Sequence, residues 1–162
     1  MIVYHGSTLE IISPDNQHSF RHLDFGQGFY VTPVFEQAER WAKRKADLIE
    51  QDFAVINEYE MTENWQNFNV KTFDDDNLEE WLDFIADCRN GGNLYQNFDL
   101  ILGKVADDKV FRVVNMYIKG IFDKDKALKE LKIYENYQQI AFISQQSIDK
   151  LLIFKQSIKV NL

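Results

Sequence analysis

The segment LDFGQGFYVTP, residues 23–33, contains the clearest local signal in the sequence. It places two of the chain's seven glycines, Gly26 and Gly28, directly before a Phe-Tyr-Val-Thr run that is typical of a buried strand. Glycine permits a sharp turn and lets the backbone pass close to another group. The stretch therefore predicts a tight turn that feeds a strand and a close approach at the two glycines.

On either side of this stretch the sequence predicts a strand at 2–5, a turn-rich loop over 6–24 and a strand at 28–33. Thr32 and Pro33 fit an N-cap and a first-turn proline, so a helix is expected over 34–51. Its apolar stripe contains Phe35, Ala38, Trp41, Ala42, Leu48 and Ile49. Its outer face carries two pairs of opposite charge at i,i+4 spacing, Glu36/Arg40 and Glu39/Lys43.

The rest of the chain continues the mixture of strands and helices. The acidic run 74–76 favours the start of a helix that ends at Gly91, rather than a metal site. Residues 110–118 fit a strand and a helix equally, and both remain open. Further strands are expected at 53–61, 67–73, 98–103, 138–144 and 153–160, and further helical segments at 123–134 and 145–152. The pattern predicts an α+β fold.

Composition narrows the class of protein. A chain of 162 residues, 45% of them hydrophobic, is long enough to bury one core, so we expect a single domain over 1–162. The net charge of -8 argues against duplex nucleic acid as a partner. The one cysteine, Cys88, excludes an internal disulfide. The first residues contain no basic leader and no long apolar run, which predicts a cytoplasmic protein without a membrane partner.

Several common sites are absent from the sequence. The three histidines, His5, His18 and His22, lack metal-ligand spacing with one another or with Cys88, so no metal is expected. The pair of glycines in GQG lacks the third glycine of a dinucleotide-binding turn. No phosphate loop and no Gly-x-Ser-x-Gly elbow is present.

Two short motifs, YHGS at 4–7 and GQGFYVT at 26–32, carry a resemblance. Their pairing resembles the NAD-binding site of the ADP-ribosyltransferase superfamily, in the branch that includes the poly(ADP-ribose) polymerases. With QAERWA, WLDFI, FDLILGKVADD and QIAF, they are more closely similar to an uncharacterised bacterial and phage domain-of-unknown-function family grouped with those transferases. The resemblance spans nearly the whole chain and implies a split β-sheet with helices between and flanking the strands.

The resemblance implies a role for each matching residue. His5 would hydrogen-bond the ribose hydroxyls of NAD, the backbone of Gly6 with Ser7 would hold the nicotinamide carboxamide, and Tyr30 would stack on the ring. Thr8 is a further expected NAD-binding residue. Gly26 and Gly28 would let the loop pass a flat ligand, with Asp24 beside it. Such residues suit a reaction in which the nicotinamide glycosidic bond breaks through an oxocarbenium-like ribose.

The sequence departs from that family at the catalytic glutamate. The matching strand offers Gln138 and Gln139, of which Gln139 is favoured as catalytic and Gln138 as an NAD contact. A neutral amide stabilises positive charge less than a carboxylate does, so transfer of one ADP-ribose is expected rather than a polymer. Asp107, Asp108 or Asp24 could supply the acid, although carboxylates at 107 and 108 are also typical of a solvated turn.

The sequence therefore predicts an NAD-dependent transferase that attaches one ADP-ribose to a macromolecule. The family resemblance also implies a toxin or effector with a neutralising partner, an antitoxin. Two alternatives stay open. One is a non-catalytic module that binds NAD, ADP-ribose or a protein partner after loss of the acid, and the other is a structural domain without a ligand.

Overall fold

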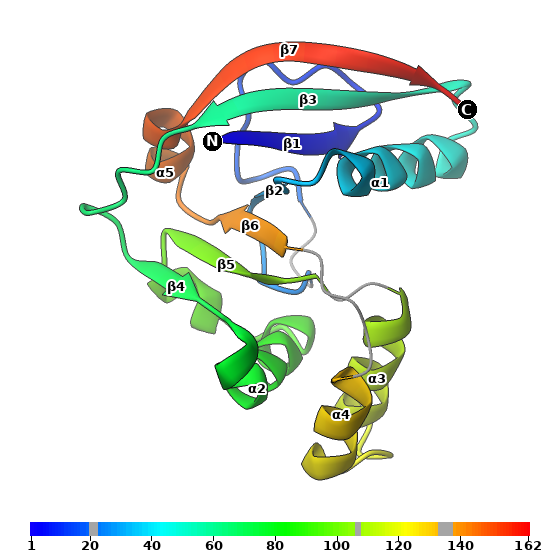
Figure 1. Cartoon of the computed structure of the whole chain (residues 1–162), viewed down its shortest axis with the longest axis vertical. Helices are drawn as coiled ribbons and strands as arrows, with labels where there is room; N and C mark the ends of the chain where they lie inside the picture. The colour runs from blue at the N-terminus through cyan, green and yellow to red at the C-terminus, as the bar shows by residue number, and fades with distance from the viewer. Residues whose placement is uncertain (20–22, 106–107, 133–137) are drawn as a thin grey trace.

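The computed structural model describes residues 1–19, 23–105, 108–132 and 138–162 (Figure 1). Within these ranges the strands are β1 (Ile2–Ser7), β2 (Phe29–Val31), β3 (Phe53–Met61), β4 (Val70–Thr72), β5 (Leu100–Lys104), β6 (Gln138–Phe142) and β7 (Leu152–Asn161). The helices are α1 (Phe35–Leu48), α2 (Leu78–Arg89), α3 (Asp108–Ile118), α4 (Lys124–Leu131) and α5 (Gln145–Leu151), with 3-10 turns at Asp75–Asn77 and Leu94–Asn97. This mixture confirms the expected α+β class.

The strands form two sheets, in the orders β1-β3-β7 and β2-β6-β5-β4. Every strand pair is antiparallel except β4 with β5. The sheets meet where the N–H of Tyr4 donates to the carbonyl of Thr32 at 2.8 Å and the N–H of Thr32 donates back at 2.9 Å. In Figure 1 the first sheet lies at the top beside α1, and α2, α3 and α4 lie at the bottom beyond the second sheet.

Helix α1 packs closely on β1 and β3 because small residues line its inner face. Three fully buried alanines repeat there at a spacing of four: Ala38, Ala42 and Ala46. A Cβ atom on Gly6 would lie 2.2 Å from the carbonyl oxygen of Ala38, so this approach requires glycine. Since side chains alternate along a strand, Gly6 against the helix leaves His5 and Ser7 on the opposite face of β1.

The start of α1 differs from the prediction. The helix begins at Phe35, and its N-cap is Val34, which makes no side-chain cap. The predicted cap, Thr32, has another role: its hydroxyl donates to the carbonyl of Gln138 at 2.9 Å and accepts from the N–H of Val34 at 3.1 Å. Thr32 therefore ties the end of β2 to β6 instead of starting the helix.

The end of α1 also comes earlier than predicted. The helix ends at Leu48, and Glu50 has a φ of 55°, a left-handed conformation that stops helical hydrogen bonding. Leu48 and Ile49 are exposed, so the predicted apolar stripe is wrong at this end. The ion pair predicted between Glu39 and Lys43 is present at 2.9 Å.

The acidic run before α2 starts a helical segment, as predicted. The carboxylate of Asp74 accepts from the N–H groups of Asp76 and Asn77 at 3.0 and 3.2 Å, which caps the 3-10 turn that leads into α2. Gly91 follows α2 with a φ of 83°, as a helix-ending glycine does. The strand expected at 67–73 shortens to β4.

Residues 110–118, which the sequence leaves open, belong to helix α3. The choice follows from packing, because three buried valines fall at helical spacing on one face: Val110, Val113 and Val114. They join the core cluster that also contains residues of α2 and α4. The predicted helix at 123–134 begins as α4, and residues 133 and 134 lie outside the described residues.

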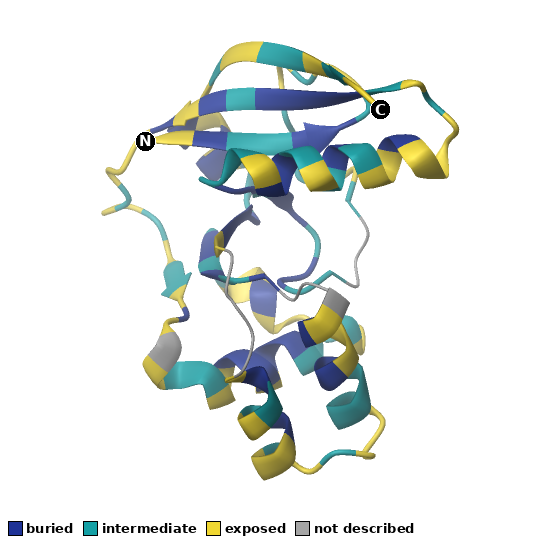
Figure 2. Cartoon of the chain, turned by 45° about the vertical axis from the view of Figure 1, so that its right-hand side comes forward, coloured by how far each residue is buried: buried dark blue, intermediate teal, exposed yellow. Residues whose placement is uncertain are grey.

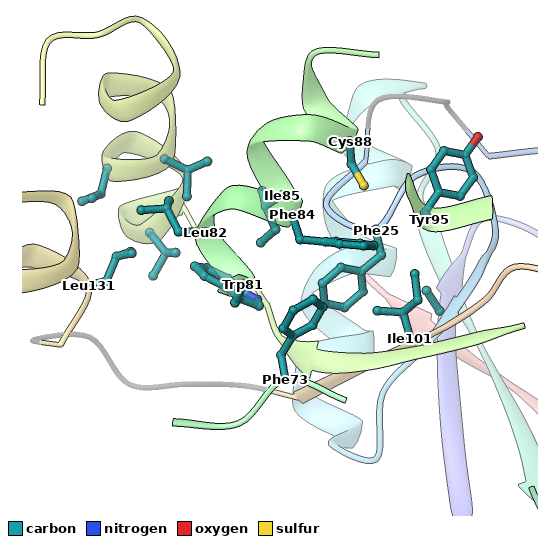
Figure 3. Close-up of a cluster of buried hydrophobic side chains, with 14 of the residues drawn as sticks. Phe25, Phe73, Trp81, Leu82, Phe84, Ile85, Cys88, Tyr95, Ile101 and Leu131 are labelled. Carbon is teal, nitrogen blue, oxygen red and sulfur yellow. The ribbon is translucent and has the colours of Figure 1, made fainter. Parts of the chain in front are cut away.

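An aromatic cluster fills the space between α2 and the second sheet (Figure 3). The rings of Phe25, Phe73 and Phe84 lie 5.1 to 6.2 Å apart, and Trp81 is buried in the same cluster. Phe25 belongs to the opening stretch and is fully buried, so it anchors the turn that precedes β2. In contrast to this buried cluster, β7 carries mostly exposed and half-buried residues (Figure 2). Within the described residues, none of the helices has the length and apolar character needed to cross a membrane.

Candidate functional site

A cavity of about 660 Å³ lies where the two sheets meet. Its walls come from β1, β2, β6, the loop before β2, the middle of α1 and the end of α2. The volume falls within the roughly 300–1,000 Å³ that is usual for small-molecule pockets. Six of the predicted site residues line it: His5, Ser7, Asp24, Gly28, Tyr30 and Gln139. The fold thus brings residues from both ends of the chain to one cavity.

His5 is held on β1 as a neutral imidazole. Its ring stacks on that of Phe29, with centroids 4.4 Å apart. Its Nδ1 lies 2.6 Å from the carbonyl oxygen of Tyr30, and a carbonyl only accepts, so Nδ1 carries the proton. Burial first, and then the charge of Lys45, lowers the pKa of His5 to about 3. The remaining ring nitrogen, Nε2, is therefore an acceptor for a hydroxyl group.

Tyr30 fastens the turn that precedes its own strand. Its hydroxyl donates to the carbonyl of Gly26 at 2.6 Å and accepts from the N–H of Phe25 at 3.0 Å. Burial, followed by the nearby charge of Asp24, raises the pKa of Tyr30 well above its ordinary value. The phenol consequently stays protonated and keeps both bonds, while the residue lines the cavity.

The two glycines of the turn have reasons within the protein. Gly26 has a φ of 77°, and a Cβ atom there would lie 2.3 Å from the ring of Tyr95. A Cβ atom on Gly28 would lie 2.6 Å from the carbonyl oxygen of Phe142 on β6. The close approach expected from the sequence is therefore to neighbouring protein atoms. Gly28 also lines the cavity, whereas Gly26 is not among its lining residues.

The backbone of Gly6 faces the outer edge of β1. Backbone groups alternate in direction along an antiparallel strand, so those of Gly6 point the same way as those of Tyr4, toward the second sheet. The carbonyl of Gly6 accepts from Nζ of Lys45 at 2.6 Å. Lys45 is exposed as a whole residue, yet it lines the cavity, and burial of its amino group lowers its pKa.

The residues after Gly6 divide between the cavity and its surroundings. Ser7 lines the cavity, and its hydroxyl accepts from the N–H of Leu9 at 3.3 Å. The carbonyl of Thr8 accepts from the side chain of Gln51 at 3.0 Å, and neither Gly6 nor Thr8 is among the lining residues. Of the motif predicted at 5–8, His5 and Ser7 reach the cavity.

Gln139 lies on β6 next to a carboxylate. Its Nε2 donates to Oδ2 of Asp24 at 3.3 Å and to the carbonyl of Lys104 at 3.3 Å. Both partners accept, which fixes the amide and leaves Oε1 as its remaining acceptor. A glutamate at this position would direct an oxygen at the same two acceptors. The environment therefore favours glutamine, and the negative charge beside it belongs to Asp24.

Asp24 is in turn held by Arg89 at the end of α2. Nε of Arg89 donates to Oδ1 of Asp24 at 3.0 Å, and Nη2 forms an ion pair with the same oxygen. Both side chains are 11% exposed. The guanidinium also lies over the ring of Phe111, 4.1 Å from its centroid. Three residues from the loop, α2 and β6 thus form one network: Asp24, Arg89 and Gln139.

The other predicted residues lie elsewhere. Gln138 is exposed and is not among the lining residues; its carbonyl accepts the hydroxyl of Thr32. Asp107 lies outside the described residues. Asp108 opens α3, but its side chain is also outside what the structure describes. Their acid role therefore remains a prediction.

Sequence reasoning missed several residues of the cavity wall. Trp41 and Lys45 share one helical face at a spacing of four, although Trp41 was assigned to the core stripe. Asp15 and His18, three residues apart, form a local pair that the spacing could have indicated. Arg89 gave no such signal, because its partner Asp24 is 65 positions away.

A second, more polar pocket of about 400 Å³ is lined by amide side chains, among them Asn16, Gln17 and Gln27. It contains none of the predicted site residues. Over the part of the chain that the structure describes, no group of three or more His, Cys, Asp or Glu residues could hold a metal ion. The larger cavity, with its histidines, carboxylates and cations, is therefore the candidate site.

Residues 1–154 match the family model described as a protein of unknown function (DUF3990). The chain belongs to the DUF3990 family. This confirms the domain-of-unknown-function part of the resemblance noted from the sequence motifs. No curated protein matches the chain, and no solved structure does either. All the cavity residues discussed above lie within the range that the family model matches.

Proposed function

We propose that this chain is an NAD-dependent ADP-ribosyltransferase that attaches a single ADP-ribose to a macromolecule. The observation that supports this most is the convergence of His5, Tyr30 and Gln139 on one cavity. They come from β1, β2 and β6, which belong to two different sheets. The motif resemblance by itself predicts that an imidazole, a phenol and an amide belong to one site.

The chemistry of the three groups suits NAD. Neutral His5 offers Nε2 as an acceptor for a ribose hydroxyl. The aromatic ring of Tyr30 offers a wall for the nicotinamide. Gly6 is not itself among the lining residues, but its carbonyl is bonded to Lys45, which is; in this proposal the carboxamide reaches that carbonyl and shares it with Lys45. In this proposal the split of the strands into two sheets is the transferase-like split sheet, with NAD bound between its halves.

Cleavage breaks the bond between C1′ of the ribose and the nicotinamide nitrogen, and nicotinamide leaves with the electron pair. The ribose then carries positive charge, which a nearby carboxylate stabilises. Asp24 supplies that charge in this proposal, with Gln139 binding a ribose hydroxyl through Oε1. The negative charge is thus one side chain away from the position where the resembling family carries it.

A charge exchange tests this assignment. We expect the full chain to release nicotinamide from NAD. Asp24→Asn should slow this release at least about tenfold, because electrostatic groups of this kind often contribute 10²-fold or more. The double variant Asp24→Asn with Gln139→Glu should recover most of the wild-type rate. Release measured by chromatography, with melting curves to confirm folding, gives the answer. Asp47→Asn, the same change at an exposed site on α1, is the matched control. A wild-type chain that releases no nicotinamide refutes the enzyme.

One observation favours the alternative of a non-catalytic module. Arg89 already compensates the charge of Asp24, and Nε2 of Gln139 is occupied, so the pair can also be a purely structural link across the cavity. The module binds NAD or ADP-ribose and yields no product. Calorimetry that detects NAD binding while chromatography detects no nicotinamide would establish it. A toxin role with a neutralising antitoxin is a proposal that either form of the site allows.

A further inference from the structure

Two side chains at the cavity wall form a pair that the proposed function does not yet use. Nδ1 of His18 lies 2.7 Å from both carboxylate oxygens of Asp15. Both residues line the cavity that contains His5, Tyr30 and Gln139. The side chain of His18 is 88% exposed, so it stands at the solvent side of that wall. The pair therefore lies where a second substrate would enter.

Hydrogen bonds on both sides of the pair hold its segment, residues 15–19, in place. The side chain of Asn16 donates to the carbonyl of Ile143 at 2.6 Å, directly after β6. The hydroxyl of Ser19 accepts from the N–H of Gly28 at 2.9 Å, directly before β2. The carboxylate of Asp15 also accepts from the N–H of Gln17 at 2.8 Å. His18 is thus held between two strands that build the cavity.

The carboxylate of Asp15 also determines which nitrogen of His18 is available. A carboxylate only accepts, so Nδ1 of His18 is the donor and the neutral ring offers Nε2 as a base. The bond from Gln17 first, and then His18, lowers the pKa of Asp15, which keeps the carboxylate charged. An imidazole oriented by a charged carboxylate is the arrangement that enzymes use to remove a proton from a hydroxyl nucleophile.

We infer that His18 is the general base that activates the acceptor, with Asp15 as its positioning residue, and that the acceptor is a side-chain hydroxyl of a protein. This inference rests on the proposed transferase function. The net charge of -8 disfavours a nucleic acid as the source of the hydroxyl. A carboxylate acceptor would have no proton to lose, so a base at the entrance would serve no purpose.

The step balances without another reactant. The bond between C1′ and the nicotinamide nitrogen breaks, and nicotinamide leaves with the electron pair. The acceptor oxygen forms the new bond to C1′ with its own lone pair. Its proton passes to Nε2 of His18, and the resulting imidazolium is stabilised by Asp15 until solvent removes the proton.

The test uses the full chain, NAD with a labelled adenosine and a cell lysate. We expect His18→Gln to lower the rate of protein labelling about 100-fold, as loss of a general base does, while its Kd for NAD stays within twofold of wild type. Asp15→Asn lowers labelling at least about tenfold, since it removes the orienting carboxylate. Added imidazole restores labelling to His18→Ala, a result that a merely structural role would not give. Gln17→Ala, which leaves both bonds of Asp15 in place, is the control.

The linkage identifies the acceptor. A hydroxyl-derived acetal resists neutral hydroxylamine, whereas an ester formed on a carboxylate is cleaved by it. Label that resists hydroxylamine and nuclease but is removed by protease supports the inference. Label released by hydroxylamine or nuclease, free ADP-ribose as the sole product, or wild-type labelling by His18→Gln overturns this inference but leaves the proposed function standing. A wild-type chain that releases no nicotinamide overturns the proposed function as well.

Discussion

The two walls of the cavity are built in different ways. The wall of β1 and β2 is held by packing and backbone bonds: Gly6 against α1, His5 against Phe29, and Tyr30 onto its own turn. The wall of β6 and the loop is held by charge, through Asp24 and Arg89. We therefore expect the first wall to be most sensitive to added volume at Gly6 and the second wall to be most sensitive to loss of charge at Asp24 or Arg89.

The largest effect is expected from added volume in the first wall. Gly6→Val would place a Cβ atom 2.2 Å from the carbonyl oxygen of Ala38, which is backbone and cannot turn aside. We expect a loss of about 4 kcal/mol or more, at the upper end for overpacked sites, and little folded protein. Urea unfolding followed by circular dichroism measures it.

Gly120→Ala is the matched control for this substitution. Gly120 has a φ of 72° but no atom within 4 Å of an added Cβ, so only conformational strain applies. That strain costs about 1 kcal/mol. Equal losses in the two variants would show that α1 shifts to accommodate the side chain, so that the contact between Gly6 and Ala38 is not rigid.

The two walls also differ in how far their site residues could be predicted from the sequence. His5 and Tyr30 are predicted as site residues because the short motifs that contain them resemble the NAD-binding site of a known superfamily. Arg89 could not be, because its ion pair joins positions 65 apart and depends on how α2 packs. Gln139 was predicted, but its carboxylate neighbour Asp24 could only be one candidate among several until the fold brought the two together.

The same distinction holds for the fold. Long elements with a clear period, such as β3 and α2, were predicted near their observed bounds. Element ends depended on single backbone conformations, and Glu50 ended α1 three residues early through a positive φ that glutamate rarely adopts. The segment at 110–118 needed tertiary packing, since Val110 and Val113 suit a strand as well as a helix.

In the second wall we expect the largest loss of folding stability from an unpaired charge. Arg89→Met removes the guanidinium from Asp24 at a site where both side chains are 11% exposed. We expect a loss of about 3 kcal/mol, as for other largely buried pairs that lose one partner. Asp24→Asn combined with Arg89→Met should recover part of it, because no uncompensated carboxylate remains. A double variant no more stable than Arg89→Met would mean that the ion pair does not hold this wall.

A smaller effect, on pH dependence, returns to the first wall. The folded pKa of His5 is about 3, below its ordinary value near 6.5, so the unfolded chain binds the proton more readily between these values. His5 therefore contributes stability that is present above pH 6.5 and is lost as the pH falls toward 3, by at most about 1.4 kcal/mol per pH unit. Urea midpoints of wild type and His5→Gln from pH 7 to 4 should converge as the pH falls. Parallel curves would contradict the burial of this imidazole.

The smallest effect concerns Lys45, a cation of α1 that lies next to the first wall. Nζ of Lys45 donates to the carbonyl of Gly6, the same oxygen that the proposed carboxamide contact requires. Lys45→Met removes this competitor and leaves the apolar part of the side chain, so nicotinamide should bind about threefold more tightly, a gain near 0.6 kcal/mol on the scale of tenfold per 1.4 kcal/mol. Lys43→Met, two residues earlier in α1 where Lys43 pairs with Glu39, controls for the loss of charge. Calorimetry with nicotinamide measures both. Weaker binding in Lys45→Met would mean that the ammonium contacts the ligand itself, and the first wall would then recognise its ligand through charge as well as shape.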